Sequence, residues 1–185
     1  QRSIAFITSL VLSVVSMSAH AQCTAEWLPS GPVPGVNLGP LRALTLWDSD
    51  GAGPLAPRLV VGGNFSTAGG VAANKLALYD PPSQTWTALS SGFNQPPYSL
   101  ASLPNGDLVA GGQFTSAGGV PVTYIAKWNG TTWSTVGPAM NGFCVFDLHV
   151  TANGDLLAGG NFTTIGALSA NRVARWNGST WSALG

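Results

Sequence analysis

The sequence predicts an all-β fold, part of a β-propeller with three four-stranded antiparallel blades and an orphan N-terminal strand. The main observation is a repeat, because residues 108–137 recur almost verbatim as residues 156–185 and more loosely as residues 59–92. The double glycines of these copies lie 49 and 48 residues apart, beginning at Gly62, Gly111 and Gly159. All-β units of this length are typical of propeller blades. The 24 glycines leave no apolar pattern of helical period, which argues against helices.

The composition favours a folded, weakly charged protein. Charged residues make up 8% of the chain, against about a quarter in average proteins, and hydrophobic residues make up 45%. Disordered chains show the opposite balance. Seven basic residues balance seven acidic ones and form no run, so a nucleic-acid partner is not expected.

Residues 1–21 are predicted to be a signal peptide. Arg2 precedes an uncharged, largely apolar run over residues 4–18, and the small-x-small sequence at residues 19–21 fits a signal-peptidase site. Cleavage after Ala21 would leave Gln22 as the mature N-terminus. A transmembrane anchor is the alternative, but the run is short for a span of about 20 residues. We therefore expect a secreted, periplasmic or cell-surface protein with no membrane span once the peptide is removed.

The two cysteines, Cys23 and Cys144, are interpreted in the light of this compartment. In an oxidising environment such a pair can form a disulfide, although the sequence does not show that the two residues meet. Cys144 lies in the apolar run 143–146, so a buried thiol is the other interpretation. Neither cysteine belongs to a CxxC or Cys/His pattern of a zinc site.

The rest of the chain divides into a leader and three blades. In the leader, residues 22–35, the segment around Trp27 is expected to form the orphan outer strand, and an unstructured leader is the alternative. The blades are expected at residues 36–92, 93–138 and 139–185.

The two inner strands of each blade follow from apolar runs separated by turn residues. The expected inner hairpins are 41–47 with 59–65 across an insertion at 48–57, 98–103 with 108–114, and 143–151 with 156–162. In blades 2 and 3, the turns hold Asn105-Gly106 and Asn153-Gly154, which predict two-residue hairpins with positive φ at both positions.

Because glycine weakens a strand, the double glycine at the end of each second strand is expected to have a structural cause. That cause is either a close backbone approach or a β-bulge. A phenylalanine stands two residues after each glycine pair and is expected to fill space between neighbouring blades. In the three copies it is Phe65, Phe114 and Phe162.

The third and fourth strands are expected to form an outer hairpin with two aromatic residues. In blade 2, Asn129-Gly130 predicts a two-residue turn. The resulting register pairs Trp128 with Thr131 and sets Trp133 diagonally across from Trp128 on the same face. Packing between blades is the favoured role of these aromatic pairs, and a carbohydrate platform is the other.

This unit resembles kelch-type repeats, in which an apolar strand ends in Gly-Gly and a Tyr or Trp is followed by another Trp. It is more similar still to the glycine-rich Rax2-like repeats of secreted bacterial and fungal surface proteins, which read GGxFtxaGg…iArwnGssWsaLG. Residues 111–137 and 159–185 carry that pattern, and residues 62–89 match it in part. The resemblance covers roughly three quarters of the chain and implies a propeller presented outside the cell. The copper-ligating relatives of kelch proteins use Tyr and His clusters, which this chain does not match, so no catalytic residue is carried over.

Two groups of residues are weak candidates for chemistry. Asp147 and His149 alternate onto one face of a strand and could form half of an acid–base site, although polar pairing is the simpler role. Asp48 and Asp50 precede Gly51 as at the start of a calcium loop, but the third oxygen ligand and the distal glutamate are missing, so a solvated glycine-proline loop is favoured. We therefore expect no catalytic residue, no cofactor and no metal site, with Asp48 and Asp50 as the only weak metal candidates.

These features predict an exported, non-enzymatic propeller segment that serves as an extracellular or cell-surface binding or scaffold module for a protein or glycan ligand. The alternative function is the substrate-binding part of a larger secreted enzyme whose catalytic residues lie elsewhere. An open β-solenoid is the alternative architecture. Propellers run from about four blades upward, so the three blades are expected to continue into further repeats. If the present segment is produced alone, it is expected to expose apolar faces at both ends.

Overall fold

The computed structural model describes residues 35–37, 39–51 and 53–184, which form strands, turns and loops with no helix. Three four-stranded antiparallel sheets hold most of these residues, which confirms the all-β prediction. The first sheet consists of β1 (Leu41–Trp47), β2 (Arg58–Gly63), β5 (Leu76–Asp80) and β6 (Thr85–Ala88). The second sheet consists of β7 (Pro97–Ser102), β8 (Leu108–Gly112), β11 (Ile125–Trp128) and β12 (Trp133–Thr135). The third sheet consists of β13 (Val145–Val150), β14 (Leu156–Gly160), β17 (Val173–Trp176) and β18 (Trp181–Ala183).

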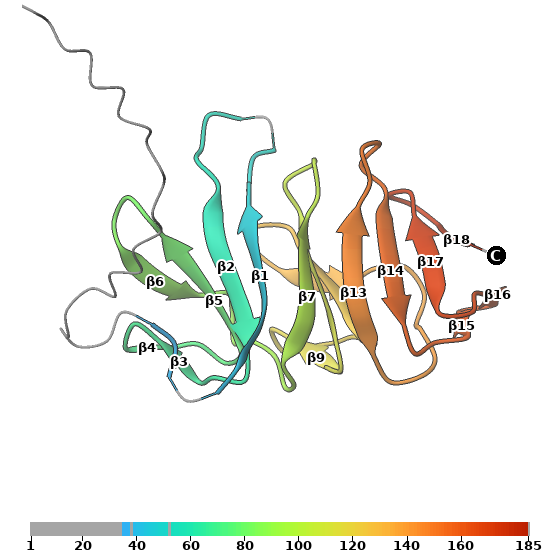
Figure 1. Ribbon diagram of the computed structural model, residues 1–185, viewed down its shortest axis with the longest axis horizontal. Coiled ribbons are helices and arrows are strands. Elements are labelled where there is room, and N and C mark those ends of the chain that lie inside the picture. Colours follow the sequence, from blue (N-terminus) through green and yellow to red (C-terminus); the bar gives the residue numbers. More distant parts are fainter. Residues whose placement is uncertain (1–34, 38, 52, 185) are drawn as a thin grey trace, which may run out of the picture. The chain divides into compact units, whose positions relative to one another are not determined.

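All three sheets have the same topology. The strands of each sheet lie side by side in chain order, as β1-β2-β5-β6 in the first sheet. Figure 1 shows the first strands of the sheets, β1, β7 and β13, next to one another. The three inner hairpins pair as expected, with strand ends that differ from the prediction by up to two residues.

A small hairpin follows the second strand of each sheet. These hairpins are β3 (Thr67–Ala68) with β4 (Val71–Ala72), β9 (Ser116–Ala117) with β10 (Val120–Pro121), and β15 (Thr164–Ile165) with β16 (Leu168–Ser169). An asparagine at the same position of each repeat holds the small hairpin through hydrogen bonds of its side chain. Asn94 Oδ1 accepts the backbone N–H of Thr115 (3.0 Å) and of Ser116 (3.1 Å), and Asn94 Nδ2 donates to Thr115 Oγ1 (2.8 Å). Asn37 and Asn141 make the corresponding bonds in the other two repeats.

The double glycine of each sheet faces a β-bulge in the neighbouring inner strand. In the first sheet, Arg42 is the extra residue, between Leu41, which faces Gly63, and Ala43, which faces Gly62. The second and third sheets show the same register shift. A Cβ on the second glycine of each pair would lie 2.4–2.9 Å from a backbone oxygen just before the inner strand, so only glycine fits there. The bulge and the close approach, proposed as alternatives, therefore occur together.

The Asn-Gly turns of the inner hairpins differ from the prediction. Gly106 and Gly154 have positive φ, 88° and 85°, but the asparagine before each does not. The Leu103 N–H donates to Asp107 O (2.8 Å) and the Gly106 N–H donates to Leu103 O (3.0 Å), so the loop is longer than a two-residue turn. The prediction of two positive φ values is wrong, because a longer loop needs a left-handed residue only at its last position.

The register of the outer hairpins was also predicted wrongly. Trp128 pairs directly with Trp133, not with Thr131, and the two ring centroids lie 5.3 Å apart. Asn129 causes the shift, because its Oδ1 accepts the N–H groups of Thr131 (3.0 Å) and Thr132 (2.8 Å) and lengthens the turn to four residues. The third sheet repeats this arrangement.

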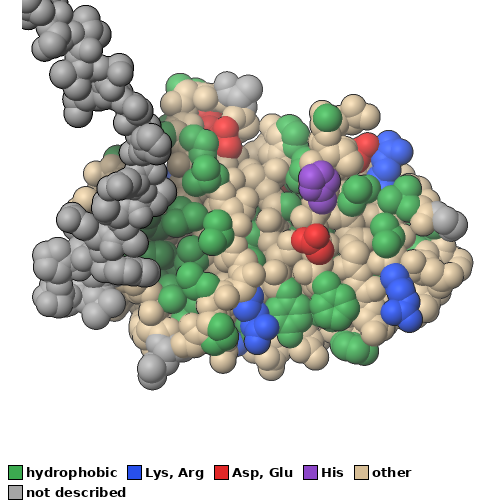
Figure 2. Space-filling view, in the orientation of Figure 1, with side chains coloured by type: hydrophobic (Ala, Val, Ile, Leu, Met, Phe, Trp, Pro, Cys, Tyr) green, Lys and Arg blue, Asp and Glu red, His purple; other side chains and the backbone are tan. Residues whose placement is uncertain are grey.

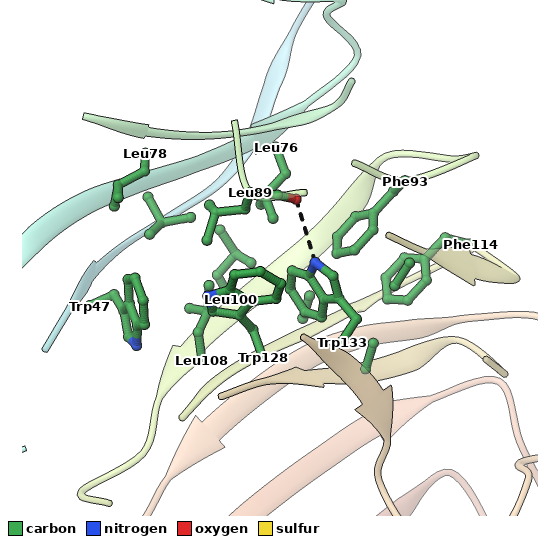
Figure 3. Packing of buried hydrophobic residues seen from close by; sticks show 14 of the residues in the cluster. Trp47, Leu76, Leu78, Leu89, Phe93, Leu100, Leu108, Phe114, Trp128 and Trp133 are labelled. Carbon is green, nitrogen blue, oxygen red and sulfur yellow. Dashed lines mark hydrogen bonds between the residues drawn. The ribbon is translucent and has the colours of Figure 1, made fainter. Parts of the chain in front are cut away.

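Successive sheets pack face to face through an apolar layer. Figure 3 shows the layer between the first and second sheets, in which leucine and aromatic side chains from both sheets interdigitate. The Trp133 indole N–H donates to Leu89 O of the preceding sheet (3.5 Å), and the Trp181 indole donates to Val136 O across the next layer (2.8 Å). The outer-hairpin tryptophans of the second and third sheets therefore pack between sheets, the favoured role.

Several predictions fall outside the described residues. They are the signal peptide at residues 1–21, the orphan strand of the leader around Trp27, and Cys23. Within the described ranges, the chain contains no helix with the length and apolar character needed to span a membrane.

Neighbouring glycines of the third sheet test the close approach. Gly160→Ala is expected to lower the free energy of unfolding by about 1–3 kcal/mol, because its Cβ would lie 2.4 Å from Cys144 O. Gly159→Ala is the matched control, since the nearest atom to its Cβ is Arg172 O at 4.0 Å, and a change within about 0.5 kcal/mol is expected. Urea denaturation in dilute solution, followed by tryptophan fluorescence, measures both variants. Equal destabilisation would contradict this explanation of the glycine pair.

Candidate functional site

The bulge residues of the three inner strands form a row on one surface. Arg42, Tyr98 and Phe146 occupy the same position in β1, β7 and β13, at the register shift opposite the double glycine. Arg42 Cζ lies 5.1 Å from the centroid of the Tyr98 ring. The rings of Tyr98 and Phe146 are nearly parallel, with an interplanar angle of 5° and centroids 6.4 Å apart. One repeated backbone irregularity therefore brings a cation and two aromatic rings from three sheets into line.

A hollow of about 580 Å³ lies along this row. Its lining residues are Pro40, Leu41, Arg42, Tyr98 and Phe146. Phe146 is 55% exposed, and the Tyr98 hydroxyl donates to Gln113 Oε1 (3.1 Å), which orients the ring. Figure 2 shows this face of the sheets, where a basic side chain lies directly beside hydrophobic ones and few other charges are present.

The row offers two kinds of contact to a ligand. The faces of the aromatic rings carry partial negative charge, which attracts the partially positive C–H groups on the less polar face of a sugar ring. The Arg42 guanidinium can donate several hydrogen bonds to hydroxyl or carboxylate oxygens. The side chains that line the hollow supply a guanidinium, a phenol and apolar groups.

Asp147 and His149, the candidate acid–base pair, are not hydrogen-bonded to each other. Asp147 Oδ1 instead accepts hydrogen bonds from Ser99 Oγ of the preceding sheet (3.1 Å) and from the N–H of Leu148 (2.9 Å). The Leu148 N–H also donates to Ser99 Oγ (3.0 Å). Asp147 therefore forms a polar contact between two inner strands, which is the simpler of the two roles considered for it.

The candidate metal residues Asp48 and Asp50 bond to their own loop. Asp48 Oδ1 accepts the N–H of Asp50 (3.4 Å), and Asp50 Oδ2 accepts the N–H of Leu55 (3.1 Å). In the part of the chain that the structure describes, no three His, Cys, Asp or Glu side chains gather closely enough to hold a metal ion. Calcium binding, the less favoured interpretation of this loop, would have these two carboxylates and no third acidic ligand among the described residues.

Cys144 lies directly before β13 and is buried, with 2% of its surface exposed. Burial raises the pKa of its thiol from the ordinary value of 9.0 to about 11. Its predicted disulfide partner, Cys23, lies outside the described residues, so the bond itself stays a prediction.

No protein-family model and no curated protein sequence matches this chain. The resemblance to kelch-like or Rax2-like repeats is therefore a hypothesis based on the repeated residues themselves.

The row was not predicted from the sequence, although a signal for it exists. Tyr98 and Phe146 each precede the first glycine of their sheet, Gly111 and Gly159, by 13 residues. The corresponding residue of the first sheet, Arg42, is displaced by the insertion at 48–57 and differs in type. Alternation of apolar and polar residues cannot reveal such positions, because a bulge interrupts that alternation.

The buried thiol predicts a pH-dependent stability. Because the folded-state pKa of Cys144 is raised, the unfolded chain releases this proton first, so the wild type loses stability as pH rises above about 9. Relative to Cys144→Ala, the wild type is expected to lose roughly 2 kcal/mol between pH 8 and pH 11. Urea denaturation in the presence of a reductant, at several pH values, measures this difference. Parallel pH profiles of the two proteins would contradict a raised pKa of the Cys144 thiol.

Proposed function

We propose that this chain is an exported, non-enzymatic β-propeller segment that acts outside the cell, or on its surface, as a binding or scaffold module. The observation that carries the proposal is the row of Arg42, Tyr98 and Phe146, one side chain from each repeated sheet, along a single hollow. A ligand that spans the row contacts all three repeats at once.

The propeller assignment is supported by the way in which the sheets follow one another. Each runs from its first to its fourth strand in chain order, the first strands of successive sheets are neighbours, and the sheets pack face to face. These are the features of consecutive blades around an axis.

A glycan is the ligand class that best fits the row. Two parallel aromatic rings, with Phe146 55% exposed and Tyr98 half-buried, offer apolar surface to successive sugar units, and Arg42 suits the hydroxyl or carboxylate oxygens of those units. Net charge is zero over the whole chain, so long-range attraction to a polyanion contributes little. A protein ligand is the other outcome of the test below.

Substitutions in the row test glycan binding. Tyr98→Ala and Phe146→Ala are each expected to weaken binding about tenfold, equivalent to about 1.4 kcal/mol, because each removes one stacking surface. Phe143→Ala is the matched control, since Phe143 is 51% exposed but does not line the hollow. Binding to an array of immobilised neutral and acidic glycans, followed by calorimetry with any that bind, measures the effect. Absence of binding to every glycan, or equal losses in all three variants, would contradict the proposal.

Export predicts a defined mature N-terminus. Expressed with an initiator methionine placed before Gln1 in a bacterial host with a secretion pathway, the chain is expected to appear outside the cytoplasm with Gln22 as its first residue. Ala21→Asp is expected to block processing, because signal peptidase requires a small residue at that position. N-terminal sequencing of the recovered protein decides the matter, and an uncleaved chain retained in the membrane would support the anchor instead.

A further inference from the structure

A tryptophan fills the space between the first and second sheets at the turn end of the inner strands. Trp47 is the last residue of β1 and is 2% exposed. Its indole N–H donates to Gly106 O, in the turn after β7 of the second sheet (2.8 Å). Figure 3 shows Trp47 in one apolar layer with Leu108 and Trp128 of that sheet. The first joint between sheets therefore contains an indole that is buried and hydrogen-bonded to a backbone carbonyl.

The second joint carries a smaller residue at the same position. Trp47 stands five residues after the bulge residue Arg42, and Leu103 stands five residues after the bulge residue Tyr98. Leu103 belongs to the apolar layer between the second and third sheets, as Trp47 belongs to the layer before it. A leucine side chain is shorter than an indole and carries no hydrogen-bond donor. The second joint thus lacks the ring that completes the first one.

A hollow of about 260 Å³ lies where that ring is missing, and we call it the joint hollow. Leu103 and Pro104 line it from the second sheet, and Gly154 and Trp176 line it from the third. Trp176 is half-buried, whereas the equivalent Trp128, in the layer that holds Trp47, is 7% exposed. The two sheets that line the joint hollow are packed against each other, and Figure 1 shows the turns after β7 and β13 side by side. The joint hollow is therefore a feature of an internal joint.

The joint hollow also has the acceptor that Trp47 uses at the first joint. The turn after β13 repeats the turn after β7, because the Thr151 N–H donates to Asp155 O (2.9 Å) and the Gly154 N–H donates to Thr151 O (2.9 Å). Gly154 has a φ of 85°, against 88° for Gly106. Gly154 O therefore corresponds to Gly106 O, but the side chain that stands in place of Trp47 offers it no donor.

We infer that the joint hollow binds a small planar aromatic molecule with an N–H donor, of which indole is the simplest. Its ring lies in the layer with Trp176, and its N–H donates to Gly154 O, as Trp47 shows at the first joint. Sites for drug-sized ligands have about 300–1,000 Å³, so about 260 Å³ suits a molecule of one or two fused rings. The row of Arg42, Tyr98 and Phe146 lies at the bulge end of the inner strands and the joint hollow at their turn end, so this second site does not rest on the proposed function.

Titration of the protein with indole, followed by the NMR signals of its backbone amides and indole N–H groups, is the first test. Indole is expected to bind with a Kd of about 0.1–1 mM and to shift the signals of Gly154 and Trp176. Benzofuran has the same shape without the N–H group, so its Kd is expected to be about tenfold higher. Absence of indole binding, shifts confined to other parts of the chain, or equal Kd values for indole and benzofuran would overturn the inference.

Two variants test whether Trp47 is the correct template. Leu103→Trp is expected to fill the joint hollow with its own indole and to raise the Kd of indole more than tenfold. Leu55→Trp is the matched control, because Leu55 is 59% exposed in the insertion and does not line the joint hollow. Trp47→Leu is expected to open the equivalent hollow at the first joint, so that indole then shifts the Gly106 amide as well.

An unchanged Kd in Leu103→Trp, a raised Kd in Leu55→Trp, or an unmoved Gly106 signal in Trp47→Leu would overturn the inference. Should either core variant fail to fold, the comparison of indole with benzofuran on the wild type decides. Glycan binding is measured with substitutions in the row, so either result leaves the proposed function to its own test.

Discussion

The structure depends on the joint between neighbouring sheets. Each four-stranded sheet is too small to bury its own apolar residues, and the packed layer between two sheets supplies the burial that a single sheet lacks. The residues that form this joint are the first glycine of each pair, the leucine beside the bulge, and the tryptophan whose indole N–H reaches a carbonyl of the preceding sheet. These residues recur because the same joint recurs, and they are among the residues that the repeated segments share.

The second glycine links this packing to the candidate site. It allows the backbone of the inner strand to approach closely, and the inner strand accommodates that approach with a bulge. The bulge releases one side chain per sheet from the packed faces, so Arg42, Tyr98 and Phe146 are available to a ligand. A feature needed for stability in every repeat therefore leaves a position at which residue type can vary with function.

Sequence reasoning predicted the strands well and their fine registers less well. The apolar runs and the glycine period were enough to predict the inner hairpins, and the second strand of one of them, β8, is buried at every residue. The direct pairing of Trp128 with Trp133 was missed because it depends on hydrogen bonds of the Asn129 side chain, which the Asn-Gly pair alone does not reveal. The row was missed because alternation assumes a regular strand. Tyr98 and Phe146 share a spacing of 13 residues to the first glycine of their sheets, but Arg42 is identified only when the register opposite the double glycine is known.

Native-state hydrogen exchange of a Leu148→Ala variant tests most directly whether the sheets stabilise one another. Leu148 belongs to the third sheet but packs against Gly111 of the second. Truncation of a buried leucine costs about 2–5 kcal/mol, and the joint predicts that amides of both β8 and β14 exchange faster. Faster exchange confined to the third sheet, with β8 unchanged, would contradict the account.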